Sequence, residues 1–235
     1  MKKVLVDSRI PKKCADTLYG LGFELIPLPA FSALPAPVAT HPDMLLFIAE
    51  KNIICHKDYL SANPDIFEKI SAEGYDIITT DEEISNEYPS DILLNALHIS
   101  DTVYCKQNSI SHFIKDFAAR KNLNICNVKQ GYSKCSVCVV DDDSAITSDP
   151  SLCRAMVASG IDVLLISSGN ITLSGYDTGF IGGCSGQNGD TVYFSGNILL
   201  HPDGEKIVDF CAKHKKTAVS LSEEPLVDIG SIFFI

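Results

Sequence analysis

The sequence lacks any long apolar run. Its apolar runs, such as residues 163–167 and 232–235, are far shorter than the roughly 20 residues that a membrane-spanning helix needs. The first residues, MKKVLVDSRIPKK, are basic but lack the apolar core of a secretory signal peptide. We therefore expect neither a membrane span nor a secretory leader.

Positive charge is also scarce. The chain has 19 Lys and Arg residues against 30 Asp and Glu residues, which gives a net charge of −11. A surface of this sign repels phosphate backbones and anionic lipid headgroups. We therefore expect no nucleic-acid or membrane partner, whereas a small cationic ligand fits the charge.

The conditions for a disulfide framework are absent as well. The nine cysteines are an odd number and lie mostly in apolar, strand-like or helix-like segments. Without a secretory signal, they are typical of reduced thiols in a cytoplasmic protein. With 46% hydrophobic and 21% charged residues, the composition is that of a globular chain rather than a disordered one.

What the chain does contain is an internal repeat. Short lead-ins to an apolar segment recur as 41-HPDMLLFI-48, 89-PSDILLNA-96, 133-SKCSVCVV-140, 178-TGFIGGCS-185 and 225-PLVDIGSIFF-234. The equivalent positions are Asp43, Asp91, Cys135, Phe180 and Asp228. They are 48, 44, 45 and 48 residues apart, and 50 residues separate Asp228 from Asp43 across the two ends of the chain. A fixed period of this length indicates structural units that share a core.

Each lead-in begins a first strand, and the same elements follow it in each unit. Second strands are expected at 52–56, 102–106, 144–148 and 191–195, helices at 63–73, 110–121, 150–159 and 203–214, and third strands at 75–79, 123–128, 162–167 and 217–221. The fifth unit has its first strand at the C-terminus, whereas its second strand (2–8), helix (11–20) and third strand (23–28) come from the N-terminus.

This arrangement predicts an α/β fold, a five-bladed propeller of ββαβ units closed by the N- and C-termini in one shared blade. We expect one domain over residues 1–235. Its blades are expected at about 41–80, 89–129, 133–168, 178–222, and 226–235 with 2–28.

Five such units resemble the pentein superfamily of guanidino-group-modifying enzymes, which includes arginine deiminases, dimethylargininases and amidinotransferases, with a non-enzymatic branch of ribosome anti-association factors. The segment 41-HPDMLLFIAEKNIICHKD-58 is similar to the superfamily's His-x-Asp blade. There the His serves catalysis and the Asp holds the guanidinium, which implies these roles for His41 and Asp43.

The segment 228-DIGSIFF-234 resembles the last enzymatic blade, in which a Gly-Ser strand leads to the nucleophilic Cys. Here Phe234 takes that place, so the usual C-terminal nucleophile is missing. The His-x-Asp blade comes earlier than in the enzymes, and the acidic Glu-Gly-Gly-Asp segment has no clear counterpart. The chain looks closest to a branch with HPD near its first blade and GGCSG in its fourth.

The repeat brings candidate site residues together. If the equivalent positions face the axis, Asp43, Asp91 and Asp228 form a carboxylate ring suited to clamp a guanidinium or amine. Cys135 in the same ring, or Cys184 after two glycines, is the candidate nucleophile. We expect His41, on the same side of the first strand as Asp43, to be the general acid and base.

Structural interpretations of the same residues remain open. An Asp before a strand is often a turn or capping residue, and Cys135 can be a buried apolar side chain. A tight hairpin also explains the glycines before Cys184. Two His and two Asp (His41, Asp43, His56, Asp58) could bind a divalent ion, but His56 precedes a helix start; we expect no metal and no cofactor.

Two functions follow from these residues. One is an enzyme of guanidino or amidine chemistry, a C–N bond hydrolase or an amidinotransferase-like protein, with an axial site for a small cationic ligand. The other is a non-catalytic binding or assembly protein on the same fold, which Phe234 favours.

Overall fold

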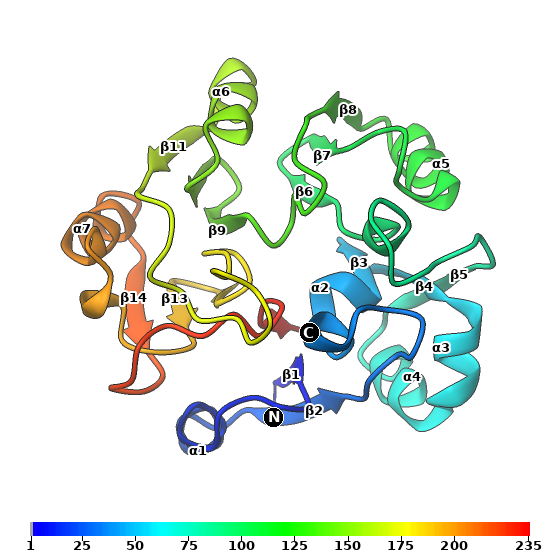
Figure 1. Cartoon of the computed structure of the whole chain (residues 1–235), viewed down its shortest axis with the longest axis horizontal. Helices are drawn as coiled ribbons and strands as arrows, with labels where there is room; N and C mark the ends of the chain where they lie inside the picture. Colours follow the sequence, from blue (N-terminus) through cyan, green and yellow to red (C-terminus); the bar gives the residue numbers. More distant parts are fainter. Residues whose placement is uncertain (1) are drawn as a thin grey trace.

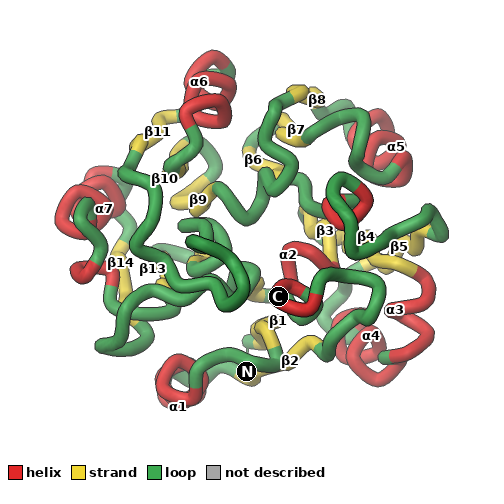
Figure 2. The backbone as a smooth tube through the Cα atoms, viewed as in Figure 1, coloured by secondary structure: helices red, strands yellow, loops and turns green. Residues whose placement is uncertain are grey.

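Five small sheets stand as blades around a central axis in the computed structural model, which describes residues 2–235 (Figure 1). In each blade the inner strand is antiparallel to the middle strand, and the middle strand is parallel to the outer strand. Figure 2 shows the longer helices at the perimeter and loops near the centre. The predicted five-bladed α/β propeller is confirmed.

Four blades follow one another along the chain. Their strands are β3 (Leu46–Ala49), β4 (Asn52–His56) and β5 (Asp76–Thr80); β6 (Leu97–Ile99), β7 (Thr102–Cys105) and β8 (Asn124–Asn127); β9 (Val137–Asp141), β10 (Ser144–Thr147) and β11 (Asp162–Leu165); and β12 (Ser185–Asn188), β13 (Thr191–Phe194) and β14 (Thr217–Ser220). Their helices are α3 (Lys57–Ala62) with α4 (Pro64–Ser71), α5 (His112–Arg120), α6 (Pro150–Ala158) and α7 (Gly204–Lys213).

The fifth blade joins the two ends of the chain, as predicted. Strand β15 (Phe233–Phe234) pairs antiparallel with β1 (Lys3–Asp7), with Val4 opposite Phe234. Strand β1 in turn pairs in parallel with β2 (Glu24–Leu28), after helix α1 (Lys12–Gly20). The two ends of the chain lie close together in Figure 1.

The repeat has a simple physical basis. Middle strands are covered on both faces, so they read as continuous apolar runs, such as the buried Ile53, Ile54 and Cys55 of β4. The helices are amphipathic; α7 buries Ile207, Phe210 and Cys211 at a helical spacing. None of the helices within residues 2–235 is long and apolar enough to cross a membrane.

The inner strands begin later than predicted. His41 is the N-cap of a one-turn helix, α2 (Pro42–Leu45), and β3 starts only at Leu46. Pro42 at the first helical position favours this turn because its fixed φ suits a helix start. The prediction that His41 and Asp43 share one side of a strand is therefore wrong.

Two other ring positions show the same shift. Asp91 lies in a short 3-10 helix, η2 (Ser90–Ile92), and Cys135 lies in a turn before β9. At these three positions the backbone therefore forms a turn or a short helix before the inner strand begins.

Candidate functional site

The axis contains two cavities. The His41 cavity, of ≈ 90 Å³, is lined by Val38, His41, Met44, Tyr132, Cys135, Leu173, Tyr176, Thr178, Phe180 and Asp228. The Lys134 pocket, of ≈ 180 Å³, is lined by Leu46, Ile48, Ala96, His98, Lys134, Val139, Ser185, Gly186, Gln187, Ile232, Phe233 and Phe234. Lead-in residues line the first, whereas mainly inner-strand residues line the second. The His41 cavity therefore lies before the inner strands, whereas the Lys134 pocket lies along them.

His41 lies between two buried carboxylates. Its Nδ1 is 3.7 Å from Asp228 Oδ1, and its Nε2 is 3.6 Å from Asp7 Oδ2. Asp7, at the end of β1, also accepts hydrogen bonds from the Arg9 backbone N–H and guanidinium. Asp7 and Asp228 therefore face different nitrogens of the imidazole, each at slightly more than hydrogen-bond distance.

Asp228 is held by backbone donors. Its Oδ2 accepts from the Phe180 N–H at 2.9 Å, and its Oδ1 accepts from the Gly230 N–H at 3.0 Å. Burial raises the pKa of Asp228 to about 6; the His41 imidazole opposes this shift and the Asp43 carboxylate adds to it. At neutral pH the cavity therefore has a buried negative charge beside a second carboxylate.

Cys135 lines the same cavity but is a poor nucleophile as it stands. Burial raises the pKa of the Cys135 thiol well above its ordinary value, and the carboxylates of Asp43 and Asp228 raise it further. Its Sγ accepts a hydrogen bond from Asn95 Nδ2 at 2.9 Å. The thiol is protonated at neutral pH unless a cation enters the cavity, because only the thiolate is stabilised by positive charge.

Asp43 lies close to the Cys135 thiol and is fully buried. Its Oδ2 accepts from the Ser231 hydroxyl at 2.7 Å, whereas its Oδ1 has no hydrogen-bond partner. Buried carboxylate oxygens without a donor are costly. The Asp43 carboxylate raises the pKa of both Cys135 and Asp228.

Asp91 is set apart from the other two carboxylates. It is buried, and its Oδ2 accepts a hydrogen bond from the Tyr132 hydroxyl at 2.6 Å. Burial raises the pKa of Tyr132, and the hydrogen bond to Asp91 raises it further. The structure thus brings His41, Cys135 and Asp228 to one cavity, whereas Asp91 reaches it only through Tyr132.

Cys184 has a different environment. It packs in an apolar cluster with Cys138, Val192 and Phe194, and its Sγ lies 3.3 Å from the Ile181 carbonyl oxygen. Burial raises the pKa of Cys184 well above its ordinary value. Cys184 lines neither of the two axial cavities.

The four residues of the alternative metal site are not brought together. His56 is the N-cap of α3, and its Nδ1 accepts from the Asp58 N–H at 3.2 Å. His41 instead lies between Asp7 and Asp228. Within residues 2–235, the one cluster with metal-ligand spacing is Asp141 and Asp143 at the β9–β10 turn with His214 at the end of α7.

Three residues of the candidate site were not predicted from the sequence: Asp7, Asn95 and Ser231. Asn95 bonds through Nδ2 to the Asp43 carbonyl oxygen and to Cys135 Sγ, and its Oδ1 accepts from the Lys134 N–H. Ser231 bridges Lys134 Nζ and Asp43 Oδ2. A signal existed for Asn95, since a lone amide within the run ILLNALHI has to be hydrogen-bonded if it is buried.

Five ββαβ blades around a central axis, closed by the termini, give this protein the pentein fold. Its structure is similar to SxtG, an amidinotransferase of Microseira wollei in the saxitoxin biosynthetic pathway, with a TM-score of 0.59, 7% identity, and coverage of 94% of this chain and 89% of that one. It is also similar to a mutant DDAH of Pseudomonas aeruginosa in complex with citrulline, with a TM-score of 0.55, 8% identity, and coverage of 100% and 99%.

A third structure with this likeness is the product-bound N-terminal domain of ArgZ, a cyanobacterial arginine dihydrolase. Its TM-score is 0.56 at 10% identity, with coverage of 96% of this chain and 90% of that one. The chain belongs to the family described as "Family of unknown function (DUF6873)", whose model matches residues 5–233. No curated protein matches the chain significantly.

Proposed function

We propose that the His41 cavity binds the cationic guanidino, amidino or amino group of a small ligand, and that the protein acts on a C–N bond of that group. The observation that carries this proposal is the convergence of His41, Cys135 and Asp228, from three blades, on one cavity. Two buried carboxylates, those of Asp7 and Asp228, lie beside the imidazole, and those of Asp43 and Asp228 act on the thiol.

The cavity walls favour a planar cation. Tyr132, Tyr176 and Phe180 contribute aromatic rings, whose faces attract cations. A carboxylate pairs well with guanidinium because two parallel N–H donors match its two oxygens. At ≈ 90 Å³ the cavity is smaller than the about 300–1,000 Å³ of drug-sized sites. It therefore holds a ligand's end group rather than a large molecule.

A bound cation would also activate the thiol. Positive charge beside Cys135 offsets the carboxylates that raise the pKa of its thiol. Cys135 gives its thiol proton to His41, the thiolate attacks the central carbon of the guanidino group, an S–C bond forms, and the C–N bond breaks. The departing amine takes a proton from His41, and water or a second amine then displaces the sulfur. Water makes the protein a hydrolase, and an amine makes it a transferase.

The structural neighbours support this class of reaction. They are named as an amidinotransferase, a DDAH, an arginine dihydrolase and an agmatine deiminase, all guanidino-modifying enzymes. A C–N bond hydrolase or transferase is therefore the activity we assign, without a particular substrate.

A second candidate is a non-catalytic binding protein that uses the same cavity. Its support is the environment of Cys135, which is only 4% exposed and whose thiol has a strongly raised pKa. In this case the cation is held by the carboxylates, and the thiol serves only as packing.

Titration with methylguanidine tests the cation site. We expect binding by the wild type, and a loss of about tenfold to a hundredfold in Asp228→Asn, because a hydrogen bond to a charged group contributes about 1.5–3 kcal/mol. Asp190→Asn is the matched control, since the Asp190 side chain is 91% exposed. Equal affinities of Asp228→Asn and the wild type, or no binding by either, would refute the proposed function.

Alkylation separates the two candidates. An active Cys135 should react faster with cationic chloroacetamidine than with neutral chloroacetamide. The less buried Cys126 and Cys153 can also react with both reagents, so the modified thiol has to be identified. Peptide mass spectrometry identifies the modified thiol, and Cys135→Ser should abolish the preference while Cys184→Ser keeps it. If methylguanidine binds but Cys135 shows no preference for the cationic reagent, the non-catalytic candidate holds.

A further inference from the structure

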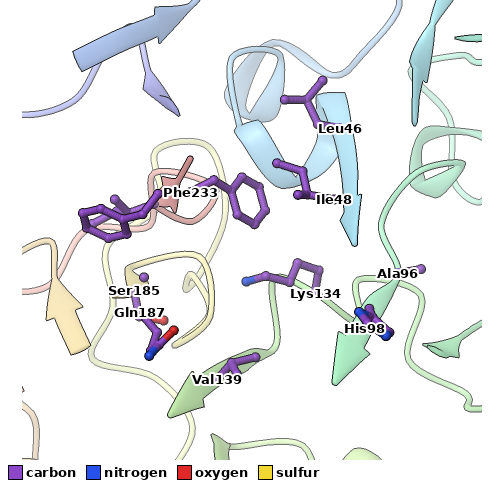
Figure 3. A pocket seen from close by; sticks show the side chains of 12 residues that line it. Leu46, Ile48, Ala96, His98, Lys134, Val139, Ser185, Gln187 and Phe233 are labelled. Atoms are coloured by element: carbon purple, nitrogen blue, oxygen red, sulfur yellow. The ribbon is translucent and has the colours of Figure 1, made fainter. Parts of the chain in front are cut away.

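The Lys134 pocket differs from the His41 cavity in the sign of its charge. Its twelve lining residues include Lys134 and no Asp or Glu. Figure 3 shows the Lys134 side chain in the middle of the pocket, with Gln187 and Phe233 on one side and His98 on the other. In a chain with a net charge of −11, this is a local site of positive potential at the axis.

The Lys134 ammonium is incompletely paired. Its Nζ donates to the Ser231 hydroxyl at 2.9 Å and lies 5.3 Å from the centroid of the Phe233 ring. Within residues 2–235, no carboxylate lies within ion-pair distance of it. An ammonium has three donors, so two of them remain for a ligand.

A second polar group faces the same space. His98 on β6 lines the pocket, and its Nε2 is buried without a hydrogen-bond partner. Burial lowers the pKa of His98, a hydrogen bond to the Ser100 backbone opposes that shift, and the neutral ring therefore has its one N–H already paired. Among the twelve lining residues, the half-buried Lys134 ammonium is therefore the charged donor that the pocket offers to a ligand.

The other walls are apolar. Leu46, Ile48, Val139 and Phe233 line the pocket, and its volume of ≈ 180 Å³ is twice that of the His41 cavity. A bare inorganic anion would leave these walls unused, whereas a carboxylate with a short hydrocarbon body would cover them.

We propose that the Lys134 pocket binds a small aliphatic monocarboxylate, with its carboxylate on Lys134 Nζ and its hydrocarbon body against Phe233 and Ile48. This site lies along the inner strands and shares no lining residue with the His41 cavity. It does not depend on the function proposed for that cavity.

Calorimetric titration of the full chain with acetate, butyrate and inorganic phosphate tests this site. We expect butyrate to bind more tightly than acetate, by about fourfold per added CH₂ at full burial. Lys134→Met should weaken butyrate binding by about tenfold to a hundredfold, because a charged hydrogen-bond donor is lost. Lys2→Met is the control, since Lys2 is exposed and bonds to Asn188 in the neighbouring β12.

A second variant covers the case in which Lys134→Met fails to fold. Val139→Phe fills the pocket without touching the ammonium, and we expect it to abolish butyrate binding. Butyrate binding that is unchanged in Lys134→Met or in Val139→Phe overturns the proposal. So does equal binding of acetate, butyrate and phosphate, because it would show that the pocket recognises charge alone.

Discussion

At the residue scale, Asp228 combines burial with ionisation near neutral pH. Its folded-state pKa of about 6 is above the value of about 3.9 for an exposed Asp. The protonated carboxyl therefore favours folding below about pH 4, and this contribution is lost as the pH rises through about 6. A bound cation reverses the balance, because it favours the ionised carboxylate.

This reversal gives a pH dependence. We expect methylguanidine affinity to increase from about pH 5 to about pH 7 and then to level off, since Asp228 has to lose its proton before it can pair with a cation. Titrations across this range measure it. Asp228→Asn should bind weakly and without this rise; a rise of equal size in that variant would assign the titration to another group.

At the element scale, the close packing of the loop before β12 explains why the segment GGCSG contains two consecutive glycines, Gly182 and Gly183. A Cβ on Gly182 would lie 2.4 Å from the Val137 carbonyl oxygen, and one on Gly183 would lie 2.0 Å from Asp228 Oδ1. Gly183 also donates its N–H to the Cys135 carbonyl oxygen and accepts from the Ser231 N–H. Without side chains at Gly182 and Gly183, the backbone of the fourth blade can pass between the third and fifth blades. These glycines therefore allow a close approach of neighbouring backbone and side-chain atoms.

Gly183→Ala should therefore be damaging. We expect it to lower the free energy of unfolding by about 1–3 kcal/mol, because the new methyl group displaces the Asp228 carboxylate. Urea unfolding measures the change. In the control Gly20→Ala, at the end of α1, nothing lies within 4 Å of the new Cβ, so it should be neutral or stabilising by up to about 1 kcal/mol. Equal stabilities of Gly183→Ala and the wild type would contradict the packing argument.

At the scale of the whole molecule, one chain of hydrogen bonds connects Lys134 in its pocket to Asp43 near the His41 cavity. Lys134 Nζ donates to Ser231 Oγ at 2.9 Å, and Ser231 Oγ donates to Asp43 Oδ2 at 2.7 Å. Asp43 in turn raises the pKa of both Cys135 and Asp228 in the His41 cavity. A charge bound in the Lys134 pocket is therefore expected to change the electrostatic potential at the His41 cavity.

This connection predicts cooperative binding. Saturating butyrate should increase methylguanidine affinity by about fivefold, because a bound anion attracts a bound cation across the axis, and the effect has to be reciprocal. Titration of each ligand in the presence of the other measures it, and Lys134→Met should remove it. Unchanged affinities in the wild type would show that the two cavities are electrostatically separate.

Much of the fold could be predicted because its pattern is local and repeated. Apolar middle strands such as NIICH and amphipathic helices such as 203–214 recur at a near-constant period, and β4 (Asn52–His56) and α7 (Gly204–Lys213) match them closely. The inner strands were less predictable, since their starts depend on the turns around His41 and Cys135.

The sequence by itself determined the ring of five blades, its closure by the termini, and the candidates His41, Cys135 and Asp228. Only the tertiary structure decided that the axis holds two cavities of opposite charge, and that Cys184 belongs to neither. The physical reason is the sequence separation of the deciding contacts: Lys134 meets Ser231 across 97 residues, and Ser231 meets Asp43 across 188. Local periodicity sets the blades, but these polar pairs depend on how different blades pack against one another.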